Sequence, residues 1–277
     1  MLDLTAIILT FNEEKNIVHC IESIRTIAKR IVVVDSYSTD NTVALAKELG
    51  AEVFQHEFVN QATQYIWGVE IADIQTKWIF RIDADERLTE ESAKELEELC
   101  LSNEDTEVNG IVIRFKVNFM GKDLKHGGIY PLCVLRVYKN GKAYMENRGM
   151  DEHLVLSEGR TIEMKNDSLH CDYKNLFSWI DKHNKYSSRE AEVYLLNLPN
   201  GGMQKGLNPR ARVRRFMKNS VYYKLPMGLR AHLYYMYRYY FKMGFLDGTE
   251  GRIFAFMQAY WYRYLVDAKI YEKRNEK

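Results

Sequence analysis

The chain has 277 residues, which is long enough for one large domain, or for a domain with an extension, and for a sizeable hydrophobic core. Lys and Arg number 39 against 38 Asp and Glu, so the formal net charge is +1, and this excludes a protein that binds polyanions through its overall charge. With 46% hydrophobic and 28% charged residues the chain is not disordered, and no stretch approaches the ~20 consecutive apolar residues that span a bilayer.

The cysteines predict a reduced protein. The four are Cys20, Cys100, Cys133 and Cys171, and they include no Cys-x-x-Cys pair, so we expect neither a zinc cluster nor structural disulfides. The sequence MLDLTAIILT at the N-terminus lacks the basic region and cleavage site of a signal peptide. We therefore expect the chain to work in a reducing cytoplasm.

Apolar runs of strand length alternate with helical segments over the first hundred residues. We expect strands at 4–10, 31–35, 51–56 and 77–83. We expect helices after Asn12 as N-cap with Glu13 and Glu14 in the first turn, within 38–50, over 61–72, and from Thr89 to about Leu101. This alternation predicts a parallel sheet with helices on both faces.

The period of the pattern changes to two after Asn109. Strands are expected at 110–119, 132–146, 152–156 and 161–165. The second of these contains Asn140-Gly141, a sequence typical of hairpin turns. An antiparallel extension of the parallel sheet is therefore expected, followed by a helix from about Asn175 to Leu196 and two further helices.

Basic and aromatic residues are concentrated near the C-terminus. Residues 203–277 contain 16 Lys and Arg against 5 Asp and Glu, a net charge of +11, which leaves −10 for residues 1–202. The same segment holds 17 of the 35 aromatic residues, and the turn-forming sequence LPNGG precedes it. We expect an α/β domain over residues 1–200 and a basic, aromatic-rich helical segment over 201–277.

Polar residues follow three of the predicted strands, in the sequences TFNEE, DSYSTD and DADE. Each set can simply cap the next helix, as Asp35, Ser36 and Asp40 would. Ligands of an open α/β sheet bind outside the carboxyl ends of its strands, so three polar ends at one edge favour a binding site. The chain has no GxGxxG or GxxxxGK[ST] motif, which argues against a dinucleotide or P-loop site.

Asp83-Ala84-Asp85 is a DxD motif that directly follows the apolar run WIFRI. Two carboxylates at i and i+2, where a strand becomes a loop, can both reach one hard cation such as Mg²⁺ or Mn²⁺. Such a tripeptide is common in solvated loops, but the preceding strand places this one at the edge of the sheet. The motif therefore favours a metal site that binds a diphosphate.

The segments TFNEEKNI, IVVVDSYSTDNT and IFRIDADERL together resemble the inverting glycosyltransferases of family 2, which have the Rossmann-like GT-A fold. Segments of the second half resemble the branch that adds glucose to the lipopolysaccharide core: HGGIYP (126–131), VLRVYKNG (134–141), DEHL (151–154), LHCDY (169–173), KHNKYSSREA (182–191) and GFLDG (244–248). The resemblance covers nearly the whole chain. It implies an α/β domain of GT-A type that binds a nucleotide sugar.

The resemblance also implies roles for single residues. The residues expected around the base and ribose of the donor are Thr10, Asn12, Glu13 and Asp35. Asp83 is expected near the donor sugar or ribose, and Asp85 on the metal. Family members often carry an Arg in the helix before the DxD strand, but Gln61 and Gln64 stand there in this chain, so no cation is assigned to that helix. Arg81 can pair with a neighbouring carboxylate.

An inverting transfer needs a general base that takes the proton of the acceptor hydroxyl. Glu152 is matched by the resemblance and is expected to be this base, although it can also be a surface carboxylate. Where the related branch has His-Glu, this chain has Asp151-Glu152, so Asp151 is the alternative, and mutual repulsion can raise one pKa. His126 and His170 are either ligands or acceptor contacts, or structural hydrogen-bonding residues.

Apolar residues lie on one face of a predicted helix over 252–264, namely Ile253, Phe256, Met257, Tyr260, Trp261 and Tyr264. Such a stripe either packs in a core or lies in a membrane interface, where Tyr and Trp are favourable and ARVRRFMK would attract anionic lipid. We expect a peripheral protein on the inner face of the cytoplasmic membrane. Nucleic-acid binding is not expected, because the tyrosines have helical rather than extended spacing.

The sequence thus predicts a metal-dependent inverting transfer of a hexose from a UDP-type nucleotide sugar. The expected acceptor is a glycolipid or lipid-linked oligosaccharide in the assembly of bacterial lipopolysaccharide core or capsule. A sugar-nucleotide pyrophosphorylase is the first alternative, but TFNEEKNI lacks the Gly-rich phosphate loop which that reaction needs. The second is a membrane-surface scaffold with a vestigial nucleotide site.

Overall fold

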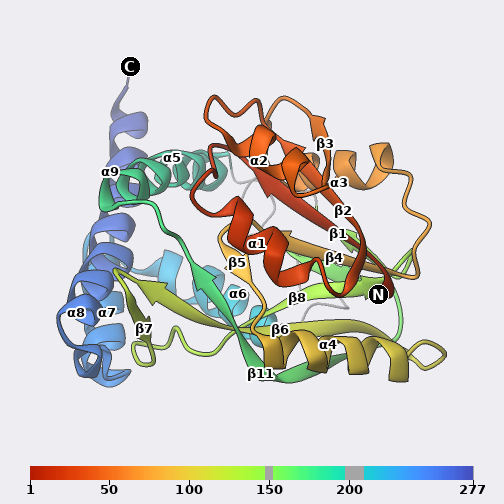
Figure 1. Cartoon of the computed structure of the whole chain (residues 1–277). Helices are drawn as coiled ribbons and strands as arrows, with labels where there is room; N and C mark the ends of the chain where they lie inside the picture. Colours follow the sequence, from red (N-terminus) through yellow and green to blue (C-terminus); the bar gives the residue numbers. More distant parts are fainter. Residues whose placement is uncertain (147–151, 197–208, 277) are drawn as a thin grey trace. The chain divides into compact units, whose positions relative to one another are not determined.

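The computed structural model describes residues 1–146, 152–196 and 209–276 (Figure 1). They form two compact units. The first, called the sheet unit, comprises Met1–Lys116, Glu152–Tyr173 and the described part of Leu132–Arg148; the second, called the helical unit, comprises Val117–Pro131 and the described part of Lys174–Lys277. The predicted boundary between residues 200 and 201 lies outside the described residues and stays a prediction.

A mixed sheet forms the centre of the sheet unit (Figure 1). Its parallel strands, in the order in which they lie side by side, are β3 (Glu52–Gln55), β2 (Ala28–Asp35), β1 (Leu2–Thr10) and β4 (Trp78–Asp83). The order continues from β4 through β8 (Leu132–Lys139), which is antiparallel to β4, to β6 (Val108–Phe119), β11 (Arg160–Cys171) and β5 (Glu86–Arg87). The predicted parallel sheet with an antiparallel extension is confirmed.

The two-residue strand β5 makes the sheet curl. Only Ala84 and Asp85 separate it from the end of β4, yet it pairs with β11 at the other end of the strand order. In this antiparallel pairing His170 is opposite Glu86. Because the chain between β4 and β5 is so short, the last strand of the sheet must return to the carboxyl end of β4. This return brings β11 beside the DxD motif.

Helices cover both faces of the sheet. On one face lie α1 (Ile17–Ile24), α2 (Thr42–Glu48) and α4 (Glu90–Ser102). The other face is covered by α3 (Gln61–Ile71) and by a two-stranded sheet of β9 (Ala143–Met145) and β10 (Leu154–Leu156). In α1 the buried residues Ile17, Ile21 and Ile24 are three or four positions apart, so they lie on the face of the helix that packs against the sheet. Burial of each isoleucine contributes about 1.5–3 kcal/mol.

Two local predictions are wrong. The first helix begins at Ile17 rather than after Asn12, because Asn12 has a left-handed backbone (φ 53°) and lies in a hydrogen-bonded loop. The Asn140-Gly141 turn does form, with the Lys142 amide donating to the Lys139 carbonyl (2.9 Å), but β9 after it pairs with β10 and not with β8. By contrast, the Thr89 cap of α4 is confirmed by its reciprocal hydrogen bonds with Ser92.

The helical unit is more divided than the sequence predicted. Its α-helices are α5 (Leu176–Leu195), α6 (Pro209–Ser220), α7 (Leu229–Met236), α8 (Gly248–Phe254) and α9 (Tyr262–Asn275), and its short strand is β7 (Lys122–Leu124). Between them lie the 3₁₀ turns η1 (Tyr222–Lys224) and η3 (Gly244–Asp247) and the π-helical turns η2 (Tyr237–Phe241) and η4 (Ala255–Trp261). None of the helices in the described part of the chain has the length and hydrophobicity to cross a membrane.

The face of α8, η4 and α9 that packs against the rest of the helical unit is offset from the predicted stripe. The buried residues are Phe254, Ala255, Ala259, Tyr262, Val266 and Ile270. Phe256 and Tyr264, which belong to the predicted stripe, are exposed. A π-helical turn bonds residues five apart rather than four, so η4 shifts the phase of a pattern read at α-helical spacing.

Glu190 of α5 lies at the centre of a buried polar network in the helical unit. Its carboxylate accepts hydrogen bonds from the hydroxyls of Tyr262 (2.6 Å) and Tyr223 (2.9 Å), and pairs with Arg263 (2.8 Å) and Lys218 (2.9 Å). Burial opposes ionisation, but the two cations outweigh it and hold the pKa of Glu190 well below its usual range. Some of the basic residues of the C-terminal segment are therefore paired with an acidic residue inside the helical unit.

Candidate active site

Asp35 organises the loop after β2. Its carboxylate is fully buried and accepts hydrogen bonds from the Thr10 hydroxyl (3.0 Å), the Gln55 amide (3.1 Å), and both the backbone amide (2.9 Å) and hydroxyl of Ser38. A carboxylate has about four acceptor positions, so these donors nearly fill it. The predicted contact of Asp35 with a nucleotide base would replace one of them, and it stays a prediction.

Asn12 and Glu13 fasten the loop after β1 to the loop after β2. The Asn12 amide donates to the Ser38 hydroxyl (2.8 Å), and the Asn12 side chain accepts from the Thr39 amide (2.8 Å). The Glu13 amide donates to the Thr42 hydroxyl (2.7 Å). The structure thus brings together the four residues predicted around the base and ribose, Thr10, Asn12, Glu13 and Asp35, at one edge of the sheet.

Two exposed aromatic residues in the same loops were missed by the sequence analysis. Phe11 and Tyr37 directly follow the paired residues Thr10 and Asp35–Ser36, and both rings are about half exposed. Flat aromatic rings at the rim of a polar site offer a stacking surface to a planar ligand. The signal was present in the sequence, because an aromatic residue stands inside each of the polar turns TFNEE and DSYSTD.

Asp83 lies between two arginines. One carboxylate oxygen, Oδ2, is 2.6 Å from Nη2 of Arg136, and the other, Oδ1, is 3.5 Å from Nη2 of Arg81. Arg136 also pairs with Glu86, and Glu86 accepts from the Asp83 backbone amide (3.1 Å). The expected pairing of Arg81 with a neighbouring carboxylate is confirmed. Arg136 was missed, although it is the only charged residue within the run LCVLRVY.

The neighbouring arginines shift the pKa values of the buried Glu86 and the partly buried Asp83 to different extents. Burial raises the pKa of Glu86, and the neighbouring Asp83 charge adds to this despite Arg136. For Asp83, burial acts in the same direction, but Arg136 and Arg81 outweigh it and hold the pKa below its usual value. The pKa of Arg136 is raised because Asp83 and Glu86 favour its charged form more than burial opposes it. Asp83 is therefore ionised at neutral pH.

Asp85 has a different environment from Asp83. Its Oδ2 is 3.4 Å from Nε2 of His170, a residue of β11. The backbone carbonyl of Asp85 accepts a hydrogen bond from the Cys171 amide (2.8 Å). His170 therefore lies at the DxD motif. His126 belongs to the helical unit, where its Nδ1 is 2.7 Å from the carboxylate of Asp247, so it is a hydrogen-bonded residue of that unit.

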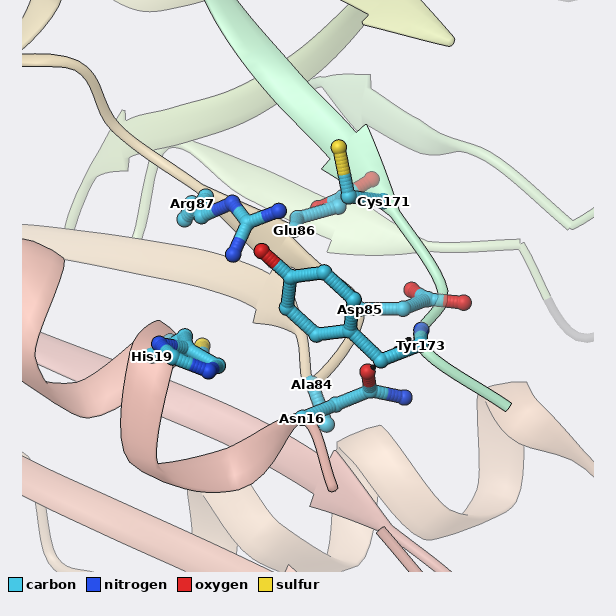
Figure 2. Close-up of a pocket in the computed structure, with 9 residues that line it drawn as sticks. Asn16, His19, Ala84, Asp85, Glu86, Arg87, Cys171 and Tyr173 are labelled. Atoms are coloured by element: carbon cyan, nitrogen blue, oxygen red, sulfur yellow. Dashed lines mark hydrogen bonds between the residues drawn. The ribbon is translucent and has the colours of Figure 1, made fainter. Parts of the chain in front are cut away.

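A small pocket opens beside Asp85. Its lining residues are Asn16, His19, Cys20, Ala84, Asp85, Glu86, Arg87, Cys171 and Tyr173. Figure 2 shows the ring of Tyr173 with its hydroxyl towards the guanidinium group of Arg87, which lies 4.6 Å from the ring centroid. The Tyr173 amide donates to the side chain of Asn16 (2.9 Å), which ties the end of β11 to the start of α1.

Asp85 and His170 are the residues at the DxD motif that could hold a divalent cation. Across residues 1–146, 152–196 and 209–276, no three or more His, Cys, Asp or Glu side chains form a complete metal cage, so further ligands would come from the diphosphate and water. The buried atoms Asp83 Oδ1, Arg81 Nε and Arg136 Nε have no hydrogen-bond partner within the described residues.

The segment that contains the expected general base is described only in part. Asp151 lies outside the described residues. Glu152 is half-buried and stands two residues before β10. Glu146, at the end of the partner strand β9, is buried, and its amide donates to the His153 carbonyl (3.0 Å). The structure thus places a buried glutamate, Glu146, opposite His153, the neighbour of Glu152 in the sequence, and the sequence analysis did not single it out.

A mixed, curled sheet with helices on both faces and a DxD motif at its edge is a GT-A fold. Residues 5–152 match the family described as Glycosyl transferase family 2. This match covers more than half of the chain, and the chain belongs to that family. It is an enzyme, a glycosyltransferase.

Relatives with sequence similarity are bacterial glycosyltransferases. The lipopolysaccharide core biosynthesis glycosyltransferase LpsC of Rhizobium meliloti is 27% identical over 284 residues, which cover 98% of this chain and 93% of LpsC. The uncharacterized glycosyltransferase RT0209 of Rickettsia typhi is 27% identical over 201 residues, 69% of this chain and 68% of that protein. A solved structure, glucosyl-3-phosphoglycerate synthase from Mycobacterium tuberculosis with Mn²⁺ and UDP-glucose, is 20% identical over 42% of this chain and 43% of that one, with a TM-score of 0.34.

Proposed function

We propose that the enzyme catalyses a metal-dependent, inverting transfer of a hexose from a UDP-type nucleotide sugar. The proposed acceptor is a glycolipid or lipid-linked oligosaccharide of the lipopolysaccharide core or capsule, reached from the inner face of the cytoplasmic membrane. The acceptor class is supported by the similarity to LpsC over nearly the whole chain. The observation that carries the donor chemistry is the DxD edge, where Asp85 and His170 lie together beside an arginine-paired Asp83.

Asp85 and His170 are the proposed metal ligands, with Mg²⁺ or Mn²⁺ as the ion. One carboxylate oxygen and one imidazole nitrogen at 3.4 Å can turn toward a shared cation. When bound, such an ion offsets the charge that develops on a diphosphate leaving group. Asp83, fixed by Arg81 and Arg136, is proposed to accept hydrogen bonds from the hydroxyls of the ribose or donor sugar.

The loops after β1 and β2 are proposed to hold the base and ribose. Because these loops are already held by many mutual hydrogen bonds, they lose little conformational entropy when a ligand binds. We propose that Phe11 or Tyr37 stacks on the base, and that Thr10, Asn12, Glu13 and Asp35 set the shape of this site.

Glu152 is the proposed general base. In a single displacement the acceptor oxygen attacks the anomeric carbon as the bond to the diphosphate breaks, and the hydroxyl proton passes to the carboxylate. Asp151 is the alternative base. The half-buried position of Glu152 beside the two-stranded sheet supports a carboxylate that is held rather than fully solvated.

Binding of UDP measured by calorimetry, with and without Mn²⁺, tests the donor chemistry. We expect Mn²⁺ to strengthen binding at least tenfold in the wild type and to have no effect in Asp85→Ala, because that carboxylate is proposed to hold the ion. Asp105→Ala is the matched control, since Asp105 is an exposed carboxylate far along the chain from the motif. Metal-independent UDP binding in the wild type would instead favour a scaffold with a vestigial site.

A further inference from the structure

Exposed apolar residues are concentrated in one short connection of the helical unit, residues 237–246, called here the aromatic turn. It contains η2, the left-handed residue Met243 and most of η3, and it joins α7 to α8. Its exposed side chains are Tyr237, Tyr240, Phe241, Met243, Phe245 and Leu246. Phe241 is 77% exposed, an unusual environment for a phenylalanine.

Aromatic rings continue from this turn over the adjoining helices. Tyr239 contacts Phe245 (ring centroids 6.1 Å apart) and stacks on Tyr235 of α7 (5.4 Å), which in turn contacts Tyr260 of η4 (6.2 Å). Tyr260 lies against both exposed residues of the predicted stripe, Phe256 (5.7 Å) and Tyr264 (5.8 Å). Ring contacts therefore link exposed Phe245 of the turn to exposed Phe256 and Tyr264 of the predicted stripe.

Hydrogen bonds to residues 125–127 fix the backbone of the aromatic turn. The Arg238 guanidinium donates to the Gly127 carbonyl, and the Gly127 amide donates to the Lys242 carbonyl (2.8 Å). A side chain at Gly244 would meet the Arg238 carbonyl at 2.9 Å, so only glycine allows this close approach. Asp247 accepts from the backbone amides of Lys125 (3.0 Å) and His126 (2.8 Å).

These contacts assign a structural role to the HGG and GFLDG segments of the sequence. Both segments lie in the helical unit, and they fix the backbone of the turn between them. A turn whose backbone is already fixed by hydrogen bonds loses little conformational entropy when its apolar side chains leave water for an apolar environment.

Charge around the turn favours an anionic partner. From residue 203 to residue 246 the sequence contains no Asp or Glu and ten Lys and Arg, of which Lys218, Arg230 and Arg238 have partners inside the helical unit. Asp247, the first acidic residue after this stretch, is buried against His126. Within the turn Lys242 is exposed, and its ammonium group lies 5.6 Å from the centre of the Tyr237 ring. Tyrosine with lysine at an apolar tip is the combination that suits the headgroup zone of a bilayer.

We propose that the aromatic turn inserts into the interface of an anionic lipid bilayer and supplies a salt-resistant part of membrane binding. Phe241 and Leu246 are its apolar tip, and Tyr237 and Tyr240 lie at the headgroup level. The proposal deepens the proposed function only in its membrane location, and it concerns vesicles that contain neither donor nor acceptor. Failure of the transfer reaction would therefore leave it intact.

Sedimentation with vesicles of phosphatidylglycerol and phosphatidylethanolamine in 0.5 M NaCl tests the proposal. At this salt concentration the Debye length is only a few ångströms, so the attraction between surface charges is largely removed. We expect the wild type to remain bound and the double variant Phe241→Ser, Leu246→Ser to bind at least tenfold more weakly. The matched control is Phe177→Ser, Leu196→Ser, which removes similarly exposed residues of α5 and of its C-cap and should bind like the wild type.

A second measurement reports insertion directly. Trp placed at Phe241 should be quenched by brominated lipid acyl chains, whereas Trp placed at Phe177 should not. Circular dichroism and UDP binding of each variant show that the fold is retained. Equal vesicle binding of the two double variants at high salt would overturn the proposal. So would a change from dimer to monomer in the Phe241, Leu246 variant with unchanged vesicle binding, because the surface would then be a contact between copies of the chain.

Discussion

Asp83 and Asp85 are two residues apart, yet their neighbours give them different chemistry. Asp83 is neutralised by Arg136 and Arg81, so it can hold an ordered position for hydrogen bonding. Asp85 lies 3.4 Å from the imidazole of His170, and this pair is the proposed cation site. The difference between the two carboxylates of the motif is therefore set by residues 53 and 85 positions away along the chain.

Replacement of Arg136 by Leu should destabilise the sheet unit by about 3 kcal/mol, because the buried Glu86 would lose its cation and the partly buried Asp83 would keep only Arg81. Urea unfolding at pH 7.5 measures this loss. Adding Glu86→Gln should recover part of it, since the buried carboxylate that has lost its cation is then removed. An unchanged free energy of unfolding in Arg136→Leu would show that the pair does not stabilise the fold.

Glu152→Gln keeps the shape of the side chain but cannot take the acceptor proton. We expect kcat to fall by about 10²-fold or more, with little change in the affinity for UDP. Steady-state transfer assays and calorimetry measure the two quantities separately. If Asp151→Asn shows this behaviour and Glu152→Gln does not, the roles of the two residues are exchanged.

At the scale of elements, the helical unit depends on polar and aromatic contacts between α5 and the C-terminal helices. His183 of α5 stacks on Trp179 (ring centroids 3.5 Å apart) and its edge meets the ring of Tyr262 (5.6 Å). Burial lowers the pKa of His183 to about 4, more than the hydrogen bond with the Trp179 carbonyl (2.8 Å) raises it. The ring is therefore packed as the neutral imidazole.

This lowered pKa predicts a loss of stability in mild acid. Between pH 7.5 and 5 the unfolded chain takes up a proton at His183, with an ordinary pKa of about 6.5, that the folded chain does not, so His183 should reduce the free energy of unfolding by about 2 kcal/mol. Unfolding of the wild type and of His183→Gln at both pH values isolates this contribution. The same pH dependence in both proteins would contradict the assignment.

At the scale of the whole molecule, the C-terminal charge is only partly available at the surface. Lys218 and Arg263 pair with Glu190, and Arg230 pairs with Asp267, all inside the helical unit. The net +11 of residues 203–277 therefore overstates the attraction to anionic lipid. Membrane binding should have an electrostatic part and an apolar part that respond differently to salt.

The electrostatic part is tested with Arg212, Arg214 and Arg215 of α6, each changed to Glu. Each basic residue near an anionic surface contributes about 1 kcal/mol, and this attraction is screened over a Debye length of about 10 Å at 0.1 M salt. In flotation assays at 0.1 M salt, binding should rise with anionic lipid content and drop in the triple variant. Equal partitioning of the wild type and the triple variant would remove α6 from the membrane site.

The sequence by itself determined the local pattern of the sheet unit. Continuous apolar runs defined β1, β2 and β4, and the Thr89 cap defined the start of α4, because side-chain period and capping depend on residues within one turn of each other. The DxD motif and the polar strand ends were visible for the same reason, as was the family resemblance that led to the nucleotide-sugar site.

Only the tertiary structure decided which charges meet. The pairing of Asp83 with Arg136 and the approach of Asp85 to His170 depend on the order β4-β8 and on the return of β5 to β11, which no local pattern encodes. The later start of α1 depends on hydrogen bonds from Asn12 and Glu13 to the loop after β2. The phase of the C-terminal stripe was changed by the π-helical turn η4, which bonds residues five apart and is not visible in a pattern read at α-helical spacing.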